Sequence, residues 1–328
     1  MSSRPIRQVA APSAAGVTDA YARVRQLVTA SPLVPSPMTG ENCWLKLEML
    51  HATGSFKLRG AMAALSRLPP GTAVVTCSAG NHGLAVAYVA RRLGIHACIV
   101  VSENASPRKI ALLKRNADEL VIFGASYDDA EQHATELAQA RGARYLSPYN
   151  DPDVILGQAS AGVEILAGFD GPVTVVCPVG GGGLAAGIGL ALAARPGSIL
   201  IGVEAARSCA MAEAIKHGKV TPIDAQPTLA EGLAGNLEDG TVTVALLAQY
   251  AEAMVTVTEA QIQQAMRHLA TAHGIIAEGA GAVAVAAILA EKIPQARRQP
   301  VVALVSGRNI DLGTWTAAVQ SAVTDATA

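Results

Sequence analysis

The chain has 328 residues, of which 51% are hydrophobic and 16% charged, with a formal net charge of −1. This length and composition allow about two globular domains, while the balanced charge and the lack of a basic tract argue against nucleic-acid binding. The sequence contains no apolar run of roughly 20 residues, no signal-peptide core and only five scattered cysteines, so we expect a cytoplasmic protein without membrane spans or a disulfide framework.

Apolar runs typical of strands alternate with helical segments along the chain. In chain order, the predicted strands are residues 42–50, 73–77, 96–101, 119–123, 172–178, 199–204 and 301–305. The predicted helices are residues 81–93, 107–116, 126–141, a segment that begins at 183, 259–273 and 279–292. This alternation predicts an α/β fold with mostly parallel sheets covered by helices on both faces.

Three glycine-rich turns, at residues 78–83, 180–183 and 306–309, follow predicted strands. Ligands of parallel α/β sheets bind beyond the carboxyl ends of strands. Four consecutive glycines before a helix expose backbone amides that can bind a phosphate together with the helix dipole. The second turn also fits the G-x-G-x-x-A pattern of dinucleotide-binding folds, with Glu204 at the end of the next strand. The glycines alone therefore leave a dinucleotide and a phosphorylated cofactor as alternatives.

One lysine, Lys57, stands among apolar and small residues in the segment 55–61. Most lysines are solvated side chains without a chemical role. A lysine shielded from water has a lowered pKa, however, and can act as a nucleophile toward an aldehyde. No Walker A pattern precedes this lysine, so a nucleotide-phosphate role is not expected.

Taken together, these segments resemble the fold-type II enzymes that depend on pyridoxal 5′-phosphate (PLP), and within them the serine/threonine dehydratase and serine racemase branch. Motifs of that branch occur in order over nearly the whole chain, at residues 54–61, 78–83, 179–184, 278–281 and 306–309. The resemblance implies a two-domain architecture of the tryptophan synthase β kind. Its large domain would comprise residues 1–49 and 147–328, and residues 50–146 would form a small mobile domain. PLP would lie between them, in a homodimer or homotetramer.

The resemblance also implies the roles of individual residues. Lys57 would hold PLP as a Schiff base and serve as the catalytic base, Asn81 would bind the 3-hydroxyl group, and Ser306 would face the pyridine nitrogen. The residues expected to bind the cofactor are Lys57, Phe56, Asn81, Gly180, Gly181, Gly182, Gly183, Leu184 and Ser306. The residues expected to bind the small amino-acid substrate are Ser78, Ala79, Gly80, His82, Tyr149 and Arg308.

The implied reaction is a carbon–oxygen lyase reaction, in which a threonine- or serine-like β-hydroxy amino acid loses water and gives a 2-keto acid and ammonia. Ala79 stands where racemases of the branch carry a serine that exchanges a proton, which favours elimination over racemisation. Arg308 replaces a more common small residue and could bind a second acidic group. Hydroxyaspartate or a hydroxyectoine-derived intermediate is therefore the alternative substrate.

No metal site is expected. Glu204 matches one ligand of the cation site found in racemase-like members, but Ala210 stands where a second ligand would be needed. A nicotinamide-dependent dehydrogenase would leave Lys57 without a role, and a non-catalytic relative of the fold would not need it.

Overall fold

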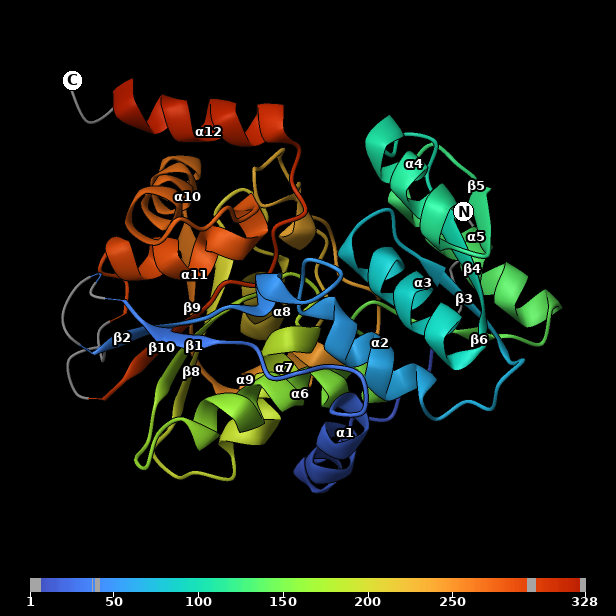
Figure 1. The fold of residues 1–328 in the computed structure, drawn as a ribbon, viewed down its shortest axis with the longest axis horizontal. Coiled ribbons are helices and arrows are strands. Elements are labelled where there is room, and N and C mark those ends of the chain that lie inside the picture. Colours follow the sequence, from blue (N-terminus) through green and yellow to red (C-terminus); the bar gives the residue numbers. More distant parts are fainter. Residues whose placement is uncertain (1–6, 37, 39–41, 294–298, 325–328) are drawn as a thin grey trace.

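The computed structural model describes residues 7–36, 38, 42–293 and 299–324, which form two lobes that lie side by side (Figure 1). The larger lobe contains a six-stranded sheet in which only the first two strands pair antiparallel. In sheet order, its strands are β1 (Leu33–Pro35), β2 (Cys43–Lys46), β10 (Val301–Leu304), β7 (Thr174–Pro178), β8 (Ile199–Ala205) and β9 (Ala251–Val257). The first six residues of the predicted large domain lie outside the described residues.

The smaller lobe is built on a four-stranded parallel sheet. In sheet order, its strands are β5 (Glu119–Ile122), β4 (His96–Val101), β3 (Ala73–Cys77) and β6 (Arg144–Tyr145). The helices between them are α3 (Asn81–Leu93), α4 (Pro107–Asn116) and α5 (Tyr127–Ala140). Alternate residues of each strand point to opposite faces, so Val74 packs with the core around α3, whereas Val75 packs with α5.

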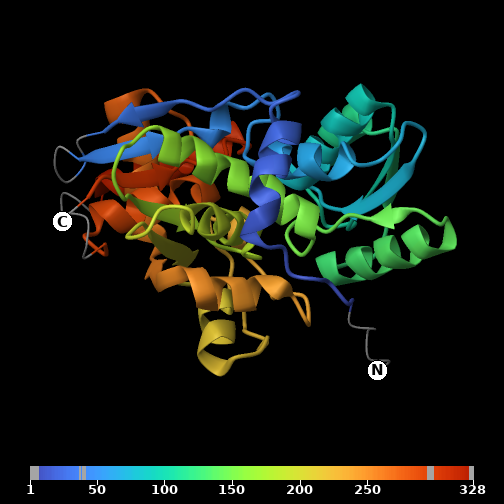
Figure 2. The ribbon, with the colours of Figure 1, turned by 90° about the horizontal axis from the view of Figure 1, so that it is seen from below.

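The remaining helices cover the large sheet or join the lobes. They are η1 (Ala14–Gly16), α1 (Val17–Val24), η2 (Glu48–Leu50), α2 (Lys57–Leu65), α6 (Pro152–Ala167), α7 (Gly183–Leu192), α8 (Ala210–His217), η3 (Glu231–Leu233), α9 (Val242–Tyr250), α10 (Glu259–His273), α11 (Gly279–Leu289) and α12 (Leu312–Thr324). Val301 and Ala303 of β10 pack toward α10 and α11, and Val302 and Leu304 pack toward α6 and α7. Figure 2 shows the same two lobes from below, with α1 crossing between them.

Helix α2 packs against both α3 and α6, and a buried ionic cluster anchors it. The guanidinium of Arg59 donates to both carboxylate oxygens of Glu48, at 2.6 and 2.8 Å, and to both of Glu164, at 2.8 and 2.6 Å. Lys46 also donates to Glu164, at 2.6 Å. All four side chains are buried. This cluster joins α2 to β2 and α6, so it fixes the helix that begins with Lys57.

The predicted α/β class is confirmed, and most predicted elements match within one or two residues. The predicted strand at residues 42–50 is wrong in its second half, where the backbone turns at Leu47 into η2. This turn buries Glu48 beside Arg59. No helix in the described ranges is long and apolar enough to cross a membrane. The described cysteines are free, and four of the five are buried.

Candidate active site

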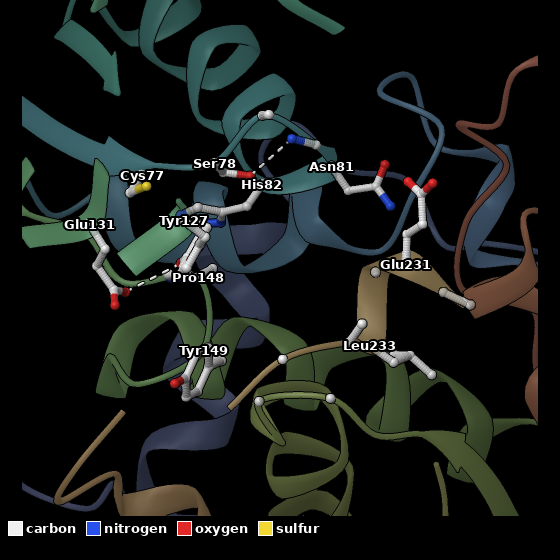
Figure 3. Close-up of a pocket in the computed structure, with 18 of the residues that line it drawn as sticks. Cys77, Ser78, Asn81, His82, Tyr127, Glu131, Pro148, Tyr149, Glu231 and Leu233 are labelled. Carbon is white, nitrogen blue, oxygen red and sulfur yellow. Dashed lines mark hydrogen bonds between the residues drawn. The ribbon is translucent and has the colours of Figure 1, made fainter. Parts of the chain in front are cut away.

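A cleft of about 1980 Å³ lies between the lobes, at the carboxyl ends of β3, β7 and β10. Residues from every predicted motif line it, and Figure 3 shows how side chains from the two lobes face each other across it. The structure therefore brings together turns that are far apart in the sequence, as in the hydrogen bond between Asn81 and Asn309, which are 228 positions apart. This is the edge of a parallel sheet where ligands are expected.

Lys57 is the first residue of α2 and lies half-buried in the wall of the cleft. Its Nζ donates to the carbonyl oxygen of Pro148 at 2.8 Å and lies 5.0 Å from the centroid of the Phe56 ring. Burial lowers the pKa of Lys57 to about 8, against the opposing charge of Glu278. A neutral amine is therefore more accessible here than on an exposed lysine.

The glycines 180–183 join β7 to the start of α7 and line the cleft. Gly182 has a φ of 83°, and no side chain caps the helix, so the first amides of α7 lack helical partners and can bind an anion. A Cβ atom on Gly181 would lie 2.3 Å from Cγ of Tyr149, and one on Gly180 would lie 2.8 Å from Cα of Leu233. Only glycine therefore fits at these two positions.

Tyr149 supports this loop from behind. Its ring packs against Gly181, and its hydroxyl accepts a hydrogen bond from the backbone amide of Glu238 at 2.6 Å. Burial raises the pKa of the Tyr149 hydroxyl above its ordinary value, so it stays protonated at neutral pH. Tyr149 also lines the cleft beside Pro148, as Figure 3 shows.

The Ser78–His82 turn follows β3, and all five of its residues, including Ala79 and Gly80, line the cleft. The Ser78 hydroxyl accepts from the backbone amide of Gly80 at 3.2 Å. His82 is buried, and its Nε2 donates to the carbonyl oxygen of Leu146 at 3.4 Å. Burial and the nearby Lys57 lower the pKa of His82 to about 3, so its imidazole is neutral.

Asn81 is the first residue of α3, and its side chain contacts the carboxylate of Glu278, for which no role was predicted. Its Nδ2 donates to Oε1 of Glu278 at 2.7 Å, and its Oδ1 accepts from Nδ2 of Asn309 at 2.6 Å. Burial raises the pKa of Glu278 to about 7. The sequence offered one indication of this contact, because Glu278 is an acidic residue directly before the motif Gly279-Ala280-Gly281.

Ser306 follows β10 and is buried at the base of the cleft. Its hydroxyl donates to the carbonyl oxygen of Ala280 at 3.4 Å, and its own carbonyl oxygen accepts from the amide of Phe56 at 3.0 Å. Phe56 and Leu184 are also in the lining. All nine predicted cofactor contacts thus lie around one cleft.

The side chain of Arg308 does not join them. It is exposed and is not part of the cleft lining, while its backbone amide donates to the carbonyl oxygen of Gly54 at 2.9 Å. That backbone bond ties the turn to Gly54 and involves no atom of the Arg308 side chain. The structure therefore gives no support to the predicted role of Arg308 in substrate binding.

Glu204, the possible metal ligand, caps a helix instead. Its two carboxylate oxygens accept from the backbone amides of Met211 and Ala212, at 2.8 and 2.9 Å. Burial raises the pKa of Glu204 to about 7, although these amides oppose the shift. In the part of the chain that the structure describes, no group of three or more His, Cys, Asp or Glu side chains could hold a metal ion.

A polar cluster in the cleft was missed by the sequence analysis. The hydroxyl groups of Tyr127 and Tyr145 donate to Oε1 of Glu131, at 3.3 and 3.1 Å, and all three residues line the cleft. Figure 3 shows Tyr127 and Glu131 on the same side of the cleft as Cys77. Tyr127 and Glu131 lie one turn apart on α5. Their spacing is that of any helix face, so the sequence carried no signal for the cluster.

Comparison with known proteins agrees with this geometry. A family model described as pyridoxal-phosphate dependent enzyme matches residues 24–307. The chain belongs to this family. The chain is also 36% identical over 293 residues to the L-threonine ammonia-lyase of Thermotoga maritima, and the alignment covers 88% of this chain and 72% of that protein.

Solved structures of the PLP-dependent family superpose on nearly the whole chain. The processed form of threonine deaminase isoform 2 from Solanum lycopersicum gives a TM-score of 0.86 at 29% identity, covering 98% of this chain and 92% of that one. Maize serine racemase gives 0.86 at 27% identity, covering 97% and 100%. The predicted family, branch, fold-type II class and PLP dependence are confirmed, and the dinucleotide alternative for the glycine loop is wrong.

Proposed function

We propose that this PLP-dependent lyase acts on a small β-hydroxy amino acid of the threonine or serine kind, from which it releases a 2-keto acid and ammonia. The observation that carries the proposal is the position of Lys57 in one cleft with the glycine loop and with a turn that bears Ala79. The similarity to an L-threonine ammonia-lyase supports the same substrate class.

The residues present fit the cofactor. The uncapped start of α7 offers backbone amides to a phosphate, and the glycines before it allow this loop to pack closely against Tyr149 and Leu233 at the wall of the cleft. Lys57, Asn81 and Ser306 line the same cleft, where we propose that they hold the aldehyde carbon, the 3-oxygen and the ring nitrogen of PLP. When bound, PLP supplies the electron sink that makes the substrate Cα acidic.

The chain's own groups then divide the remaining work. We propose that Lys57, as a neutral amine, removes the Cα proton, and that the amides and hydroxyl of the Ser78–His82 turn hold the substrate carboxylate. Ala79 carries no proton to exchange at Cα, and the imidazole of His82 is buried and neutral. These features support one-sided proton removal, and therefore elimination rather than racemisation.

The hydroxyaspartate alternative depended on Arg308 as a partner for a second carboxylate. Because that side chain is exposed outside the cleft lining, we favour a substrate with an uncharged side chain. We further propose that residues 50–146 move as a small domain over the cleft, and that the enzyme works in the cytoplasm as a homodimer or homotetramer.

Two measurements test the function. Purified protein with added PLP should show the absorbance band of a lysine Schiff base, and Lys57→Ala should lose the band while it still unfolds cooperatively. Keto-acid release should then be highest with threonine or serine among β-hydroxy amino acids. A protein without the Schiff-base band, or one that releases keto acid only from hydroxyaspartate, would contradict the proposal.

A further inference from the structure

The orientation of one side-chain amide in the cleft is fixed by a chain of hydrogen bonds that starts outside the cofactor contacts. A backbone carbonyl can only accept, so the atom of Asn309 that lies 2.8 Å from the carbonyl oxygen of Thr53 must be the donor Nδ2. The same Nδ2 lies 2.6 Å from a side-chain atom of Asn81. That atom must accept, and it is therefore Oδ1.

With Oδ1 of Asn81 directed at Asn309, its Nδ2 is directed at Oε1 of Glu278, at 2.7 Å. Each Asn amide nitrogen carries two protons. Asn309 uses both of its own, on Thr53 and Asn81, whereas Asn81 uses one on Glu278. The second Nδ2 proton of Asn81 remains for a ligand in the cleft that this residue lines, and Figure 3 shows its amide extending into that space toward Glu231.

The surrounding backbone holds Glu278 in reach of Asn81. Its amide donates to the carbonyl oxygen of Gly307 at 3.1 Å, and a Cβ atom on Gly307 would lie only 2.1 Å from Oε1 of Glu278. A glycine is therefore required there for the carboxylate to approach. Glu278 is shielded from water enough for burial to raise its pKa to about 7, and a carboxylate in such a place is costly unless it has a specific hydrogen-bond partner.

We infer that Glu278 and Asn309 are positioning residues that lock the Asn81 amide with its nitrogen toward the cofactor, so that Asn81 offers a hydrogen-bond donor to the 3-oxygen of PLP. The inference rests on the proposed site for PLP. A donor at this oxygen favours its anionic form over the protonated hydroxyl. The ratio of the absorbance bands of these two forms therefore reports the orientation of Asn81.

The variants Asn309→Asp and Glu278→Met test the lock. The first leaves no amide to donate to Oδ1 of Asn81, so the Asn81 amide should turn over, and the second removes the acceptor for its Nδ2. In each PLP-loaded variant we expect the ratio of the anionic to the neutral band to fall by roughly fivefold, the change that the loss of one hydrogen bond produces in an equilibrium constant. Glu278→Gln keeps an acceptor oxygen and should retain most of the wild-type ratio.

Glu136→Gln is the matched control, because Glu136 lines the same cleft but accepts a hydrogen bond from Gln132, and it should leave the ratio unchanged. Thermal unfolding of each PLP-free variant identifies any variant that does not fold. If only one of Asn309→Asp and Glu278→Met folds, that variant alone tests the lock. Wild-type protein that forms no Schiff base would contradict the proposed function. A Schiff base whose band ratio is unchanged in both Asn309→Asp and Glu278→Met would overturn the lock alone.

Discussion

Lys57 should give the site a characteristic pH dependence. Its pKa is lowered from 10.5 to about 8 by burial, so the neutral amine becomes the major form above that pH rather than above the ordinary value. We expect the rate of PLP uptake by the PLP-free protein to rise with pH and to level off above about 8. Stopped-flow absorbance of the Schiff-base band across this range measures the profile.

The control for this profile is Lys219→Ala, because Lys219 is exposed and its loss should leave the curve in place. An uptake rate that keeps rising through about pH 10 would show that Lys57 titrates like an exposed lysine. The same shift has a consequence for stability. The unfolded chain binds more protons than the folded one between the two pKa values, so this lysine makes the fold more stable as the pH rises through that window.

Site residues were predictable from the sequence where a proposed role depends on a side chain within a short motif. They were not predictable where the contact joins residues that are far apart in the chain. The roles proposed for Lys57, Asn81 and Ser306 depend on side chains within short motifs, and the structure places these side chains around the cleft. Arg308 shows the limit of that approach, because its side chain is exposed and is not part of the cleft lining although it stands in a matched motif. No pattern in the sequence indicates to which side of this turn the side chain points. Glu278 lay within a matched motif, but its partner Asn81 is 197 positions away.

At the scale of elements, the buried ionic cluster on α2 should be a large contributor to stability. Although burial opposes the shift, Arg59 holds the pKa of the Glu48 carboxyl well below its ordinary value of 4.5. Arg59→Met would leave the carboxylates of Glu48 and Glu164 buried without the positive charge and the hydrogen bonds of the guanidinium. We expect it to lower the free energy of unfolding by about 3–5 kcal/mol at neutral pH, as measured by denaturant titration.

The effect of Arg59→Met should shrink on acidification. A carboxyl with a lowered pKa stabilises the fold above its ordinary pKa of 4.5, and this contribution is lost as the pH falls through and below that value. Arg115→Met, on the exposed surface of α4, is the matched control and should change the free energy by less than about 0.5 kcal/mol. A similarly small loss for Arg59→Met would show that the cluster is replaceable.

The regular elements were predictable because strong local periodicity and caps define them. The predicted helices at residues 81–93 and 259–273 agree with α3 and α10, and a capping box at Thr258 starts the second. Helix α6 was not predicted because its apolar residues show little helical periodicity. Twelve of its sixteen residues are buried, so the helix is buried on more than one side. Strand β9 was missed because it pairs at the edge of the sheet with only one of its seven residues fully buried.

At the scale of the whole molecule, ion pairs connect the two lobes across the rim of the cleft. Lys109 of α4 lies 2.7 Å from Glu231 of η3, and Arg108 lies 3.7 Å from Asp311, just before α12. Both pairs are exposed, so each contributes at most about 1 kcal/mol and is screened by salt. Contacts of this strength can hold the cleft closed over a ligand and still release it.

This predicts a charge effect on substrate affinity. Lys109→Glu would oppose two carboxylates across the rim, which should raise KM by up to about fivefold at low ionic strength while kcat changes little. The exchanged pair, Lys109→Glu with Glu231→Lys, should restore the wild-type KM. At about 1 M salt the wild type, the single variant and the exchanged pair should have the same KM, because the Debye length falls to about 3 Å.

Arg141→Glu is the control, because it breaks a similarly short pair with Glu119 inside the small lobe, at 2.6 Å, and it should leave KM unchanged. If Arg141→Glu raised KM as much, or if the exchanged pair did not restore it, the rim pair would have no part in closing the cleft.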